Sequence, residues 1–314
     1  MKYIAALNYD KFIKRGVSLI DIKNVSKMID NKYILNSVNL HVNKGSIFGI
    51  IGENGAGKTT LIKCLTGIYK VTQGSILIDG EDVFDNNTVK KRIGYVSDEN
   101  QYFSSFKVKE LYKFYKETYN DFSVKRFNEL NQKLKIPMDI RVRELSKGMK
   151  MRTSILLNLS IKPDILILDE PTSGLDPIIK KEILSIIVDE VASRSVTVFI
   201  SSHHLDHIER ICDSIAIIKN GEIILKSSMD QAKNSIKKVQ VVFKDKDAIN
   251  KELLDLDGVL KIESIGRVNY IITKNYTKNL EKKLYDMGAD FVEIVDMSLE
   301  DMFIYFVEGE NSNE

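Results

Sequence analysis

The sequence has little cysteine and almost no net charge. Its 314 residues include two cysteines, Cys64 and Cys212, which are too few for a disulfide framework. We therefore expect a reducing, cytosolic compartment, with Cys64 packed as a small apolar residue. The formal net charge of +2 gives no support to nucleic-acid binding by bulk electrostatics, so no nucleic-acid partner is expected.

Long apolar runs are also missing. No stretch approaches the roughly 18 consecutive apolar residues that a membrane-spanning helix needs. The apolar segment near the N-terminus is too short for a secretory signal. If the protein works at a membrane, a separate chain must therefore supply the membrane part. The hydrophobic share of 43% and the charged share of 29% are typical of a soluble globular protein.

The most specific feature that is present is a glycine-rich segment at residues 52–60. It fits G-x-x-x-x-G-K-[ST], the phosphate-binding loop of nucleoside triphosphatases. The apolar run 47–51 predicts a buried strand before it, and residues 61–65 predict a helix after it. Glycines let backbone N–H groups approach an anion, and the helix N-terminus adds partial positive charge. Lys58 can reach the β- and γ-phosphates, while the Thr59 hydroxyl can ligate Mg²⁺. The candidate nucleotide-binding residues of this loop are Gly52, Asn54, Gly55, Gly57, Lys58, Thr59 and Thr60.

A second apolar strand, at residues 165–168, ends in two carboxylates. Asp169 is placed to hold Mg²⁺ through water, and Glu170 is placed to polarise an attacking water. In isolation, a strand that ends in a solvated acidic turn would explain the pattern equally well. The phosphate loop upstream favours the catalytic interpretation.

Two further segments carry polar residues with a possible function. Ser146 can cap the N-terminus of a helix whose backbone Gly148 keeps accessible, although alone this is an ordinary helix start. His203 and His207 stand four residues apart, a spacing that also fits a metal site, an alternative that we do not favour.

The pattern along the chain predicts three regions. Residues 1–17 form a lead-in, residues 18–235 a first domain with a helical subdomain at about 99–160, and residues 236–310 a small α+β domain. Apolar or alternating runs predict strands at 18–22, 38–42, 74–80, 196–200, 238–243, 260–265 and 268–272. The runs 215–218 and 222–225 flank Asn220-Gly221 and predict a hairpin.

Helical spacing dominates residues 105–160 and recurs in the small domain. In the first of these blocks, Leu111, Phe114 and Tyr115 are expected on one helix face, and Pro137 is expected to divide the block. Amphipathic helices are expected near 248–255 and 278–287.

Five motifs in this order resemble the ATP-binding cassette (ABC) ATPases over roughly residues 18–230. They are the loop at 52–60, the segment 145–150, Asp169-Glu170, the segment 173–176 and the segment 201–203. The resemblance implies an α/β fold: a P-loop NTPase cassette with a mixed or parallel core sheet, an antiparallel β subdomain and a helical subdomain. The tail at 296–303 resembles the close of exporter-type cassettes, where it follows a small accessory domain.

The resemblance also assigns roles to individual residues. Lys58 and the loop amides would bind phosphates, while Thr59 and Asp169 would serve Mg²⁺. Glu170 would be the catalytic carboxylate, and His203 would contact the γ-phosphate. Two cassettes would close head-to-tail around two ATP molecules, with Ser146 and Gly148 clamping the ATP of the opposite subunit and Asp176 at the dimer seam.

The implied function is ATP hydrolysis that drives a separate integral-membrane permease of the drug- and antibiotic-exporter branch. The cofactors would be ATP and Mg²⁺, and the partners would be the permease and a second ATPase subunit. The protein would be cytoplasmic and peripheral at the inner face of the cell membrane. The alternative is a soluble cassette that acts on the ribosome or on DNA. Such proteins usually carry paired cassettes or a long coiled-coil insertion, and neither is visible in the sequence.

Several positions depart from the family pattern. Ile29 stands where an aromatic residue usually stacks on adenine, and Tyr33 is out of register. Asp98 replaces the usual glutamine and could meet Mg²⁺ with a shorter reach. Lys147 and Met149 replace the commoner glycine and glutamine beside Ser146, as also occurs among drug- and antibiotic-exporter cassettes.

Three aromatic residues, Tyr102, Phe103 and Phe106, follow Asp98. In the family this region borders the groove that receives a cytoplasmic helix of the membrane partner. Packing of the three rings within their own helical subdomain is an equally good explanation.

Residues 1–17 precede the usual start of the family near Ser18. We predict that a chain without them keeps its ATPase activity, because none of the five motifs lies in this segment. Steady-state phosphate release by the truncated and full-length chains is the measurement. A large loss of activity on truncation would reject the prediction.

Overall fold

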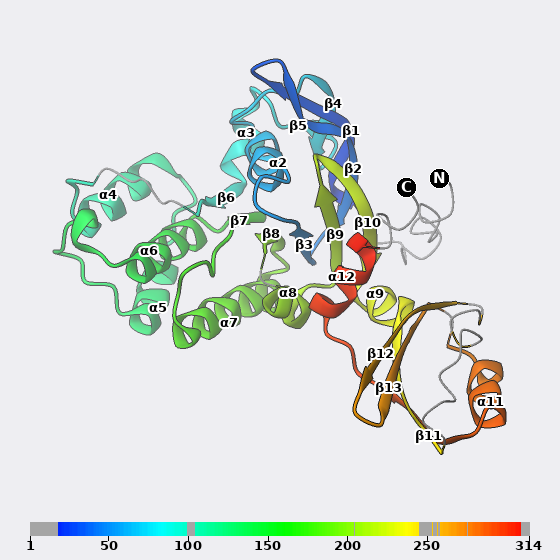
Figure 1. The fold of residues 1–314 in the computed structure, drawn as a ribbon. Coiled ribbons are helices and arrows are strands. Elements are labelled where there is room, and N and C mark those ends of the chain that lie inside the picture. The colour runs from blue at the N-terminus through cyan, green and yellow to red at the C-terminus, as the bar shows by residue number, and fades with distance from the viewer. Residues whose placement is uncertain are drawn as a thin grey trace. The chain divides into compact units, whose positions relative to one another are not determined.

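The computed structural model describes residues 18–98, 104–203, 205–244, 253, 256, 258–274 and 276–308. The chain divides into two compact units, Met1–Ser227 and Ser228–Glu314 (Figure 1). This division comes earlier than the boundary expected near residue 236, because helix α9 (Met229–Ser235) groups with the second unit. The expected extension at residues 1–17 lies outside the described residues.

A six-stranded sheet forms the centre of the first unit, with strand order β10-β9-β3-β8-β7-β6. The strands are β3 (Ile47–Ile51), β6 (Ile93–Val96), β7 (Ile165–Asp169), β8 (Thr197–Ser202), β9 (Ser214–Lys219) and β10 (Glu222–Ser228). Strand β8 pairs in parallel with both β3 and β7, and β7 pairs in parallel with β6. Every residue of β3, β7 and β8 is buried, which explains their nearly unbroken apolar sequences. The predicted buried strands are therefore confirmed.

The predicted hairpin joins β9 to β10 through Asn220 and Gly221. Both residues have positive φ, 50° and 81°, as a two-residue type I′ turn requires. A Cβ atom on Gly221 would lie only 2.3 Å from the carbonyl oxygen of Ile34. Only glycine fits this turn, because the backbone conformation and the close neighbour both exclude a side chain.

An antiparallel sheet of order β2-β1-β4-β5 packs beside the central sheet. Its strands are β1 (Ser18–Ile29), β2 (Lys32–Asn43), β4 (Gln73–Ile78) and β5 (Glu81–Asp82). Alternate residues such as Ile20 and Ile22 point inward and join a hydrophobic core shared with β3 and helix α2 (Lys58–Leu65). Cys64 is buried in this core as expected. The short helix α3 (Asn87–Lys91) is capped by the side chain of Asn86.

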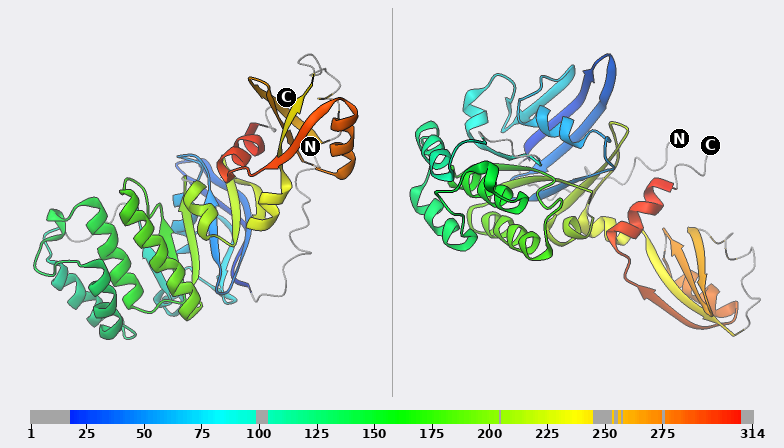
Figure 2. Two further views of the ribbon diagram at one scale, coloured as in Figure 1. Left: turned by 90° about the horizontal axis from the view of Figure 1, so that it is seen from below. Right: turned by 60° about the vertical axis from the view of Figure 1, so that its left-hand side comes forward.

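Three helices form the predicted helical region and lie together in Figures 1 and 2. They are α4 (Val108–Thr118), α5 (Val124–Leu134) and α6 (Lys147–Ser160), with a 3₁₀ turn at Val142–Glu144 before α6. Pro137 lies between α5 and α6, as expected. The expected face of α4 was wrong in part, because Leu111 is buried but Phe114 is 46% exposed. At 3.6 residues per turn, Phe114 falls outside the arc that holds Val108, Leu111 and Tyr115.

Two ion pairs attach these helices to α7 (Pro177–Arg194). Arg126 on α5 pairs with Glu190, and Arg152 on α6 pairs with Glu182. Glu190 is completely buried and also accepts from Arg194 Nη1 at 3.0 Å. The direction of α6, and with it the placement of its N-terminal turn, is therefore fixed by charged contacts as well as by apolar packing. Helix α8 (Leu205–Ile211) follows β8.

The second unit contains a four-stranded antiparallel sheet of order β12-β13-β11-β14. Its strands are β11 (Lys237–Phe243), β12 (Val259–Ile265), β13 (Val268–Thr273) and β14 (Ala289–Val295), and its helices include α9, α11 (Lys278–Asp286) and α12 (Leu299–Glu308). Helix α11 confirms the helix expected at 278–287, whereas β14 was not predicted. The helix expected at 248–255 lies outside the described residues, apart from Leu253.

In the part of the chain that the structure describes, no helix combines the length and the apolar character needed to cross a membrane.

We predict that Glu190→Gln lowers the free energy of unfolding by about 1–3 kcal/mol, because it leaves buried polar atoms with weakened partners. Urea denaturation followed by circular dichroism is the measurement. The control is Asp189→Asn, whose carboxylate is 59% exposed and should cost less than about 0.5 kcal/mol. Equal denaturation midpoints for the two variants would contradict the prediction.

Candidate functional site

The candidate residues meet because four parallel strands end at the same edge of the central sheet. Strand β3 runs into the loop at 52–60, β8 runs into His203, β7 ends at Asp169, and β6 ends just before Asp98. The strand order places β3, β8, β7 and β6 side by side. In parallel sheets, ligands bind beyond the carboxyl ends of the strands, and this edge is the location of the candidate site.

The loop at 52–60 holds the Lys58 side chain inside the protein. Lys58 Nζ donates to the carbonyl oxygens of Gly52, at 2.6 Å, and Glu53, at 3.1 Å. Lys58 begins helix α2, and its side chain is only 5% exposed. Gly52 leaves no space for a side chain, since a Cβ atom there would lie 2.4 Å from the carbonyl oxygen of Ile218. The ammonium group is therefore buried beside backbone groups that line the loop.

The remaining loop residues differ in exposure. Gly57 is buried and adopts φ +110° as the N-cap of α2. Thr60 is half-buried, and the exposed residues are Asn54, Gly55 and Thr59. No atom would lie within 4 Å of a Cβ built on Gly55. The loop thus presents an open, backbone-lined surface, which suits a phosphate chain.

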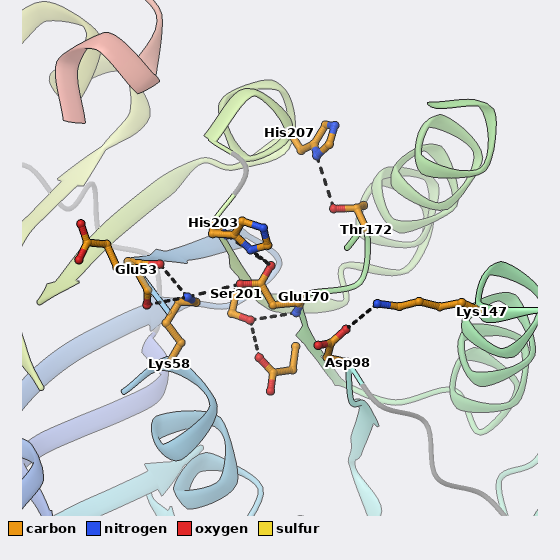
Figure 3. Close-up of polar contacts among 11 residues, drawn as sticks. Glu53, Lys58, Asp98, Lys147, Glu170, Thr172, Ser201, His203 and His207 are labelled. Atoms are coloured by element: carbon orange, nitrogen blue, oxygen red, sulfur yellow. Dashed lines mark hydrogen bonds and ion pairs between the residues drawn. The ribbon is translucent and has the colours of Figure 1, made fainter. Parts of the chain in front are cut away.

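Glu170 lies between the loop lysine and the histidine that follows β8 (Figure 3). Its Oε1 atom is 3.4 Å from Lys58 Nζ, and its Oε2 atom is 2.8 Å from His203 Nδ1. The carboxylate is almost buried, and Oε1 has no hydrogen-bond partner among the described residues. A buried carboxylate oxygen with free acceptor capacity is suited to take a hydrogen bond from water.

The backbone at Glu170 is strained, with φ +48°, a conformation that residues other than glycine seldom adopt. Ser201 helps to hold it, because the Glu170 backbone N–H donates to Ser201 Oγ at 3.0 Å. The same hydroxyl donates to Asp169 Oδ1 at 2.6 Å. Ser201 therefore holds the Asp169 carboxylate and the Glu170 backbone. Ser201 belongs to the motif at 201–203, but residue types alone gave a role only to His203.

Several neighbours act on the Asp169 carboxyl. Burial raises its pKa above the usual value, hydrogen bonds from Ser201 and Thr59 lower it, and the charges of Glu170 and Asp98 raise it again. The net shift is upward. Burial, with a smaller contribution from Asp169, also raises the pKa of Tyr95 to about 12. A cation beside Asp169 would reverse the effect of the neighbouring negative charges.

The oxygen donors Thr59, Asp169 and Asp98 fit a hard cation such as Mg²⁺. Thr59 acts on the Asp169 carboxyl by lowering its pKa, so these two donors belong to one local environment. Among the described residues, no three histidine, cysteine, aspartate or glutamate side chains are arranged to hold a metal by themselves. A cation here would therefore take the remainder of its ligands from water and phosphate. His207 instead contacts Thr172 Oγ1 at 3.4 Å and Asp206 at 3.3 Å.

The segment at Ser146 forms the expected helix start. Ser146 Oγ accepts from the Met149 backbone N–H at 3.2 Å, and Gly148 is buried against Ile179. Among the described residues, neither Ser146 nor Gly148 hydrogen-bonds to the loop at 52–60. Ser146 is exposed, so this helix N-terminus remains accessible to a ligand held by another molecule.

The remaining predicted positions are also in the described chain. Asp176 caps α7 by accepting from the backbone N–H groups of Ile178 and Ile179 at 3.1 and 3.0 Å. Ile29 is half-buried at the tip of the β1–β2 hairpin and pairs with Lys32, whereas Tyr33 is 47% exposed. Phe106 is half-buried, while Tyr102 and Phe103 lie outside the described residues.

These features define a P-loop nucleoside triphosphatase, with a phosphate loop after one strand and paired acidic residues after a neighbouring one. Comparison with known proteins gives the family. A profile described as "ABC transporter" matches residues 35–173. The chain is 32% identical over 292 residues to the ABC transporter ATP-binding protein YtrB of Bacillus subtilis, covering 91% of this chain and 97% of the relative. The chain belongs to the ABC transporter family of ATP-binding proteins.

Other similarities agree. The bacitracin transport ATP-binding protein BcrA of Bacillus licheniformis is 29% identical over 312 residues, covering 93% of this chain and 98% of that protein. A solved structure described as the ATP binding subunit of an ABC transporter superposes with a TM-score of 0.64 at 26% identity, over 69% of this chain and 92% of that one. The predicted cassette fold and the predicted family are thus confirmed, and the family is one of ATPases. The relatives' names do not favour a role on the ribosome or on DNA.

We predict that Ser201→Ala lowers the free energy of unfolding by about 1–3 kcal/mol, because the buried Glu170 N–H loses its partner. It also raises the pKa of Asp169 further, since a hydrogen bond that lowers that pKa is lost. As a Mg²⁺ donor Asp169 would have to be ionised, so Mg²⁺-dependent nucleotide binding should be lost at a higher pH than in the unaltered chain. Urea denaturation and nucleotide titration between about pH 7 and 5 measure the two effects. The exposed Ser193→Ala is the control, and identical behaviour of the two variants would refute the assignment of Ser201.

Proposed function

We propose that the chain hydrolyses MgATP as one half of a dimer and drives transport by a separate integral-membrane permease. One observation carries this proposal. Lys58, Glu170 and His203 meet at one sheet edge, whereas the helix N-terminus at Ser146 is exposed and has no bond to the phosphate loop. The two proposed parts of the nucleotide site thus lie apart within one chain, which supports a head-to-tail pair.

In this proposal, the loop residues and Lys58 bind the phosphates. Lys58 Nζ is held at present by Gly52 and Glu53 carbonyls and lies near Glu170. Phosphate oxygens offer the ammonium group stronger, charge-assisted acceptors. Thr59, Asp169 and Asp98 would hold Mg²⁺, which neutralises charge on the transferred phosphoryl group when it is bound.

Glu170 is the residue that we assign to activation of water. Its Oε1 atom, which is 3.4 Å from Lys58 Nζ but accepts no hydrogen bond among the described residues, would accept one from the attacking water, and its Oε2 atom lies 2.8 Å from His203 Nδ1. The strained backbone and the Ser201 hydrogen bond hold the carboxylate in place before substrate arrives. His203 is 37% exposed on the open side of Glu170, where it can contact the γ-phosphate.

The second chain would contribute Ser146 and Gly148 to the same nucleotide. To move a pair from mostly open to mostly closed, ATP must favour the closed state by about 5.5 kcal/mol. The N-terminus of α6 is a source of this difference, because its N–H groups would reach phosphate only after closure. Asp176, which caps the neighbouring helix α7, would lie at the seam between the two chains.

The transport role rests on the relatives. One is named as an ABC transporter ATP-binding protein and another as a bacitracin transport ATP-binding protein. We propose that the chain serves export of a drug, an antibiotic peptide or a lipid-like compound. It would act at the inner face of the cell membrane, bound to a permease through the helical region that contains Phe106 and α4. Co-purification with an integral-membrane protein, rather than co-sedimentation with ribosomes, is the expected result.

The decisive variant is Glu170→Gln, which removes the negative charge but keeps the shape of the side chain. We expect it to retain ATP binding, to lose nearly all turnover and to accumulate an ATP-bound dimer. Phosphate release and size-exclusion chromatography with light scattering are the measurements. The exposed Glu117→Gln on α4 is the control and should match the unaltered chain. Normal turnover in Glu170→Gln would remove Glu170 from its proposed role.

A further inference from the structure

Two positions that depart from the family pattern lie against each other in space. Lys147 Nζ is 3.4 Å from Asp98 Oδ1, although 49 residues separate them in the sequence (Figure 3). Lys147 is the first residue of α6, and Asp98 follows the end of β6. The ion pair therefore links the helical region to the edge of the sheet where the candidate site lies.

Lys147 occupies an electrostatically unfavourable place. The N-terminus of a helix carries partial positive charge and disfavours cations. The first turn of α6 contains no acidic residue and holds a second lysine, Lys150. Asp98 is the carboxylate that offsets Lys147 among the described residues. The Lys147 side chain also passes over Gly174, where a Cβ atom would lie 3.3 Å from Nζ.

Asp98 in turn belongs to the electrostatic environment of the candidate metal donors. Its negative charge is one of the influences that raise the pKa of Asp169. A carboxylate whose charge acts on Asp169 would be drawn to a divalent cation there. A divalent cation held by Asp98 would repel the Lys147 ammonium group and share the charge of the same carboxylate, so the two cations compete for Asp98.

We propose that the Asp98–Lys147 pair is a latch that positions the N-terminal turn of α6 in the nucleotide-free chain. The latch opens when Mg²⁺ and nucleotide engage Asp98. Lys147 is a positioning residue: it acts through Asp98 and weakens the hold of Asp98 on the metal. This inference rests on the proposed function of the site as one that binds MgATP. It gives the two departures from the family pattern, Asp98 and Lys147, a shared physical role.

The exposure of the pair sets the size of the effect. The Lys147 and Asp98 side chains are 50% and 40% exposed, so solvent and salt screen their attraction. Exposed pairs of this kind shift an equilibrium by about two- to fivefold. Coupling between sites is reciprocal. If Mg²⁺ binding weakens the Asp98–Lys147 pair, the pair must therefore weaken Mg²⁺ binding by the same factor.

A double-mutant cycle tests the competition without turnover. The four chains are the unaltered protein, Lys147→Met, Asp98→Asn and the double variant. Each is titrated with Mg²⁺ in the presence of a fluorescent, non-hydrolysable ATP analogue, and the Mg²⁺ midpoint for nucleotide binding is recorded. Lys147→Met should lower the midpoint about two- to fivefold when Asp98 is present and leave it unchanged in the Asp98→Asn background.

The matched control is Lys150→Met, which removes the same charge from the same helical turn. It should change the midpoint less than Lys147→Met does. The proposed competition would be contradicted if both lysine substitutions shifted the Mg²⁺ midpoint equally. It would also be contradicted if Lys147→Met shifted the midpoint equally with and without Asp98.

The latch is tested separately in the nucleotide-free chain by amide hydrogen exchange. Exchange at residues 146–152 should be about two- to fivefold faster in Lys147→Met and in Asp98→Asn, with no further gain in the double variant. High salt should remove the difference. Equal exchange rates in the unaltered chain and in these variants would contradict the proposed latch. A chain that binds no nucleotide under any condition would instead refute the proposed function, while the exchange result would still decide the latch.

Discussion

The parallel alignment of β6, β7, β8 and β3 is the constraint on which the site depends. Parallel strands bring their carboxyl ends to one edge, and each of these four ends runs directly into a candidate residue or loop. Burial of every residue in β3, β7 and β8 locks their register, because a shift would expose apolar side chains. Lys58, Glu170 and His203 are separated widely in the sequence and meet only because of this alignment.

The sheet brings the candidate site residues near one another, and polar contacts then fix their positions. Ser201 holds the Asp169 carboxylate and the Glu170 backbone, and both contacts are buried. In a low-dielectric surrounding, such hydrogen bonds are costly to break and hold their groups in one arrangement. Farther away, the Arg126–Glu190 and Arg152–Glu182 pairs keep α5 and α6 attached to α7. The exposed Asp98–Lys147 pair is different, because contacts of that kind are weak enough to exchange.

Much of the core could be predicted from the sequence, because its strands are apolar runs with clear ends. Residues 47–51 and 165–168 form buried strands as predicted, and the phosphate loop begins its helix at Lys58. Strand β14 was missed because its residues do not alternate cleanly: Phe291 and Ile294 are both exposed at the sheet edge, and its pairing with β11 shifts register. Phe114 was misplaced because helical spacing does not show how wide the buried arc is.

The site was predictable wherever a motif has a local pattern. Its contacts were not predictable where they join distant residues of ordinary type. Nothing near Ser201 marks it as the partner of Asp169 and Glu170, and nothing near Lys147 points to Asp98. These contacts follow from the strand order and from the placement of α6, which only the folded chain defines.

The central claim is that one nucleotide site needs two chains. Complementation tests it most directly: Lys58→Ala and Ser146→Arg chains, each inactive alone, are mixed and assayed for ATP hydrolysis. The account predicts that mixing restores up to about one quarter of the normal activity, because half of the random pairs are mixed and each contains one intact site. Activity that stays at the level of the separate variants would contradict the shared site.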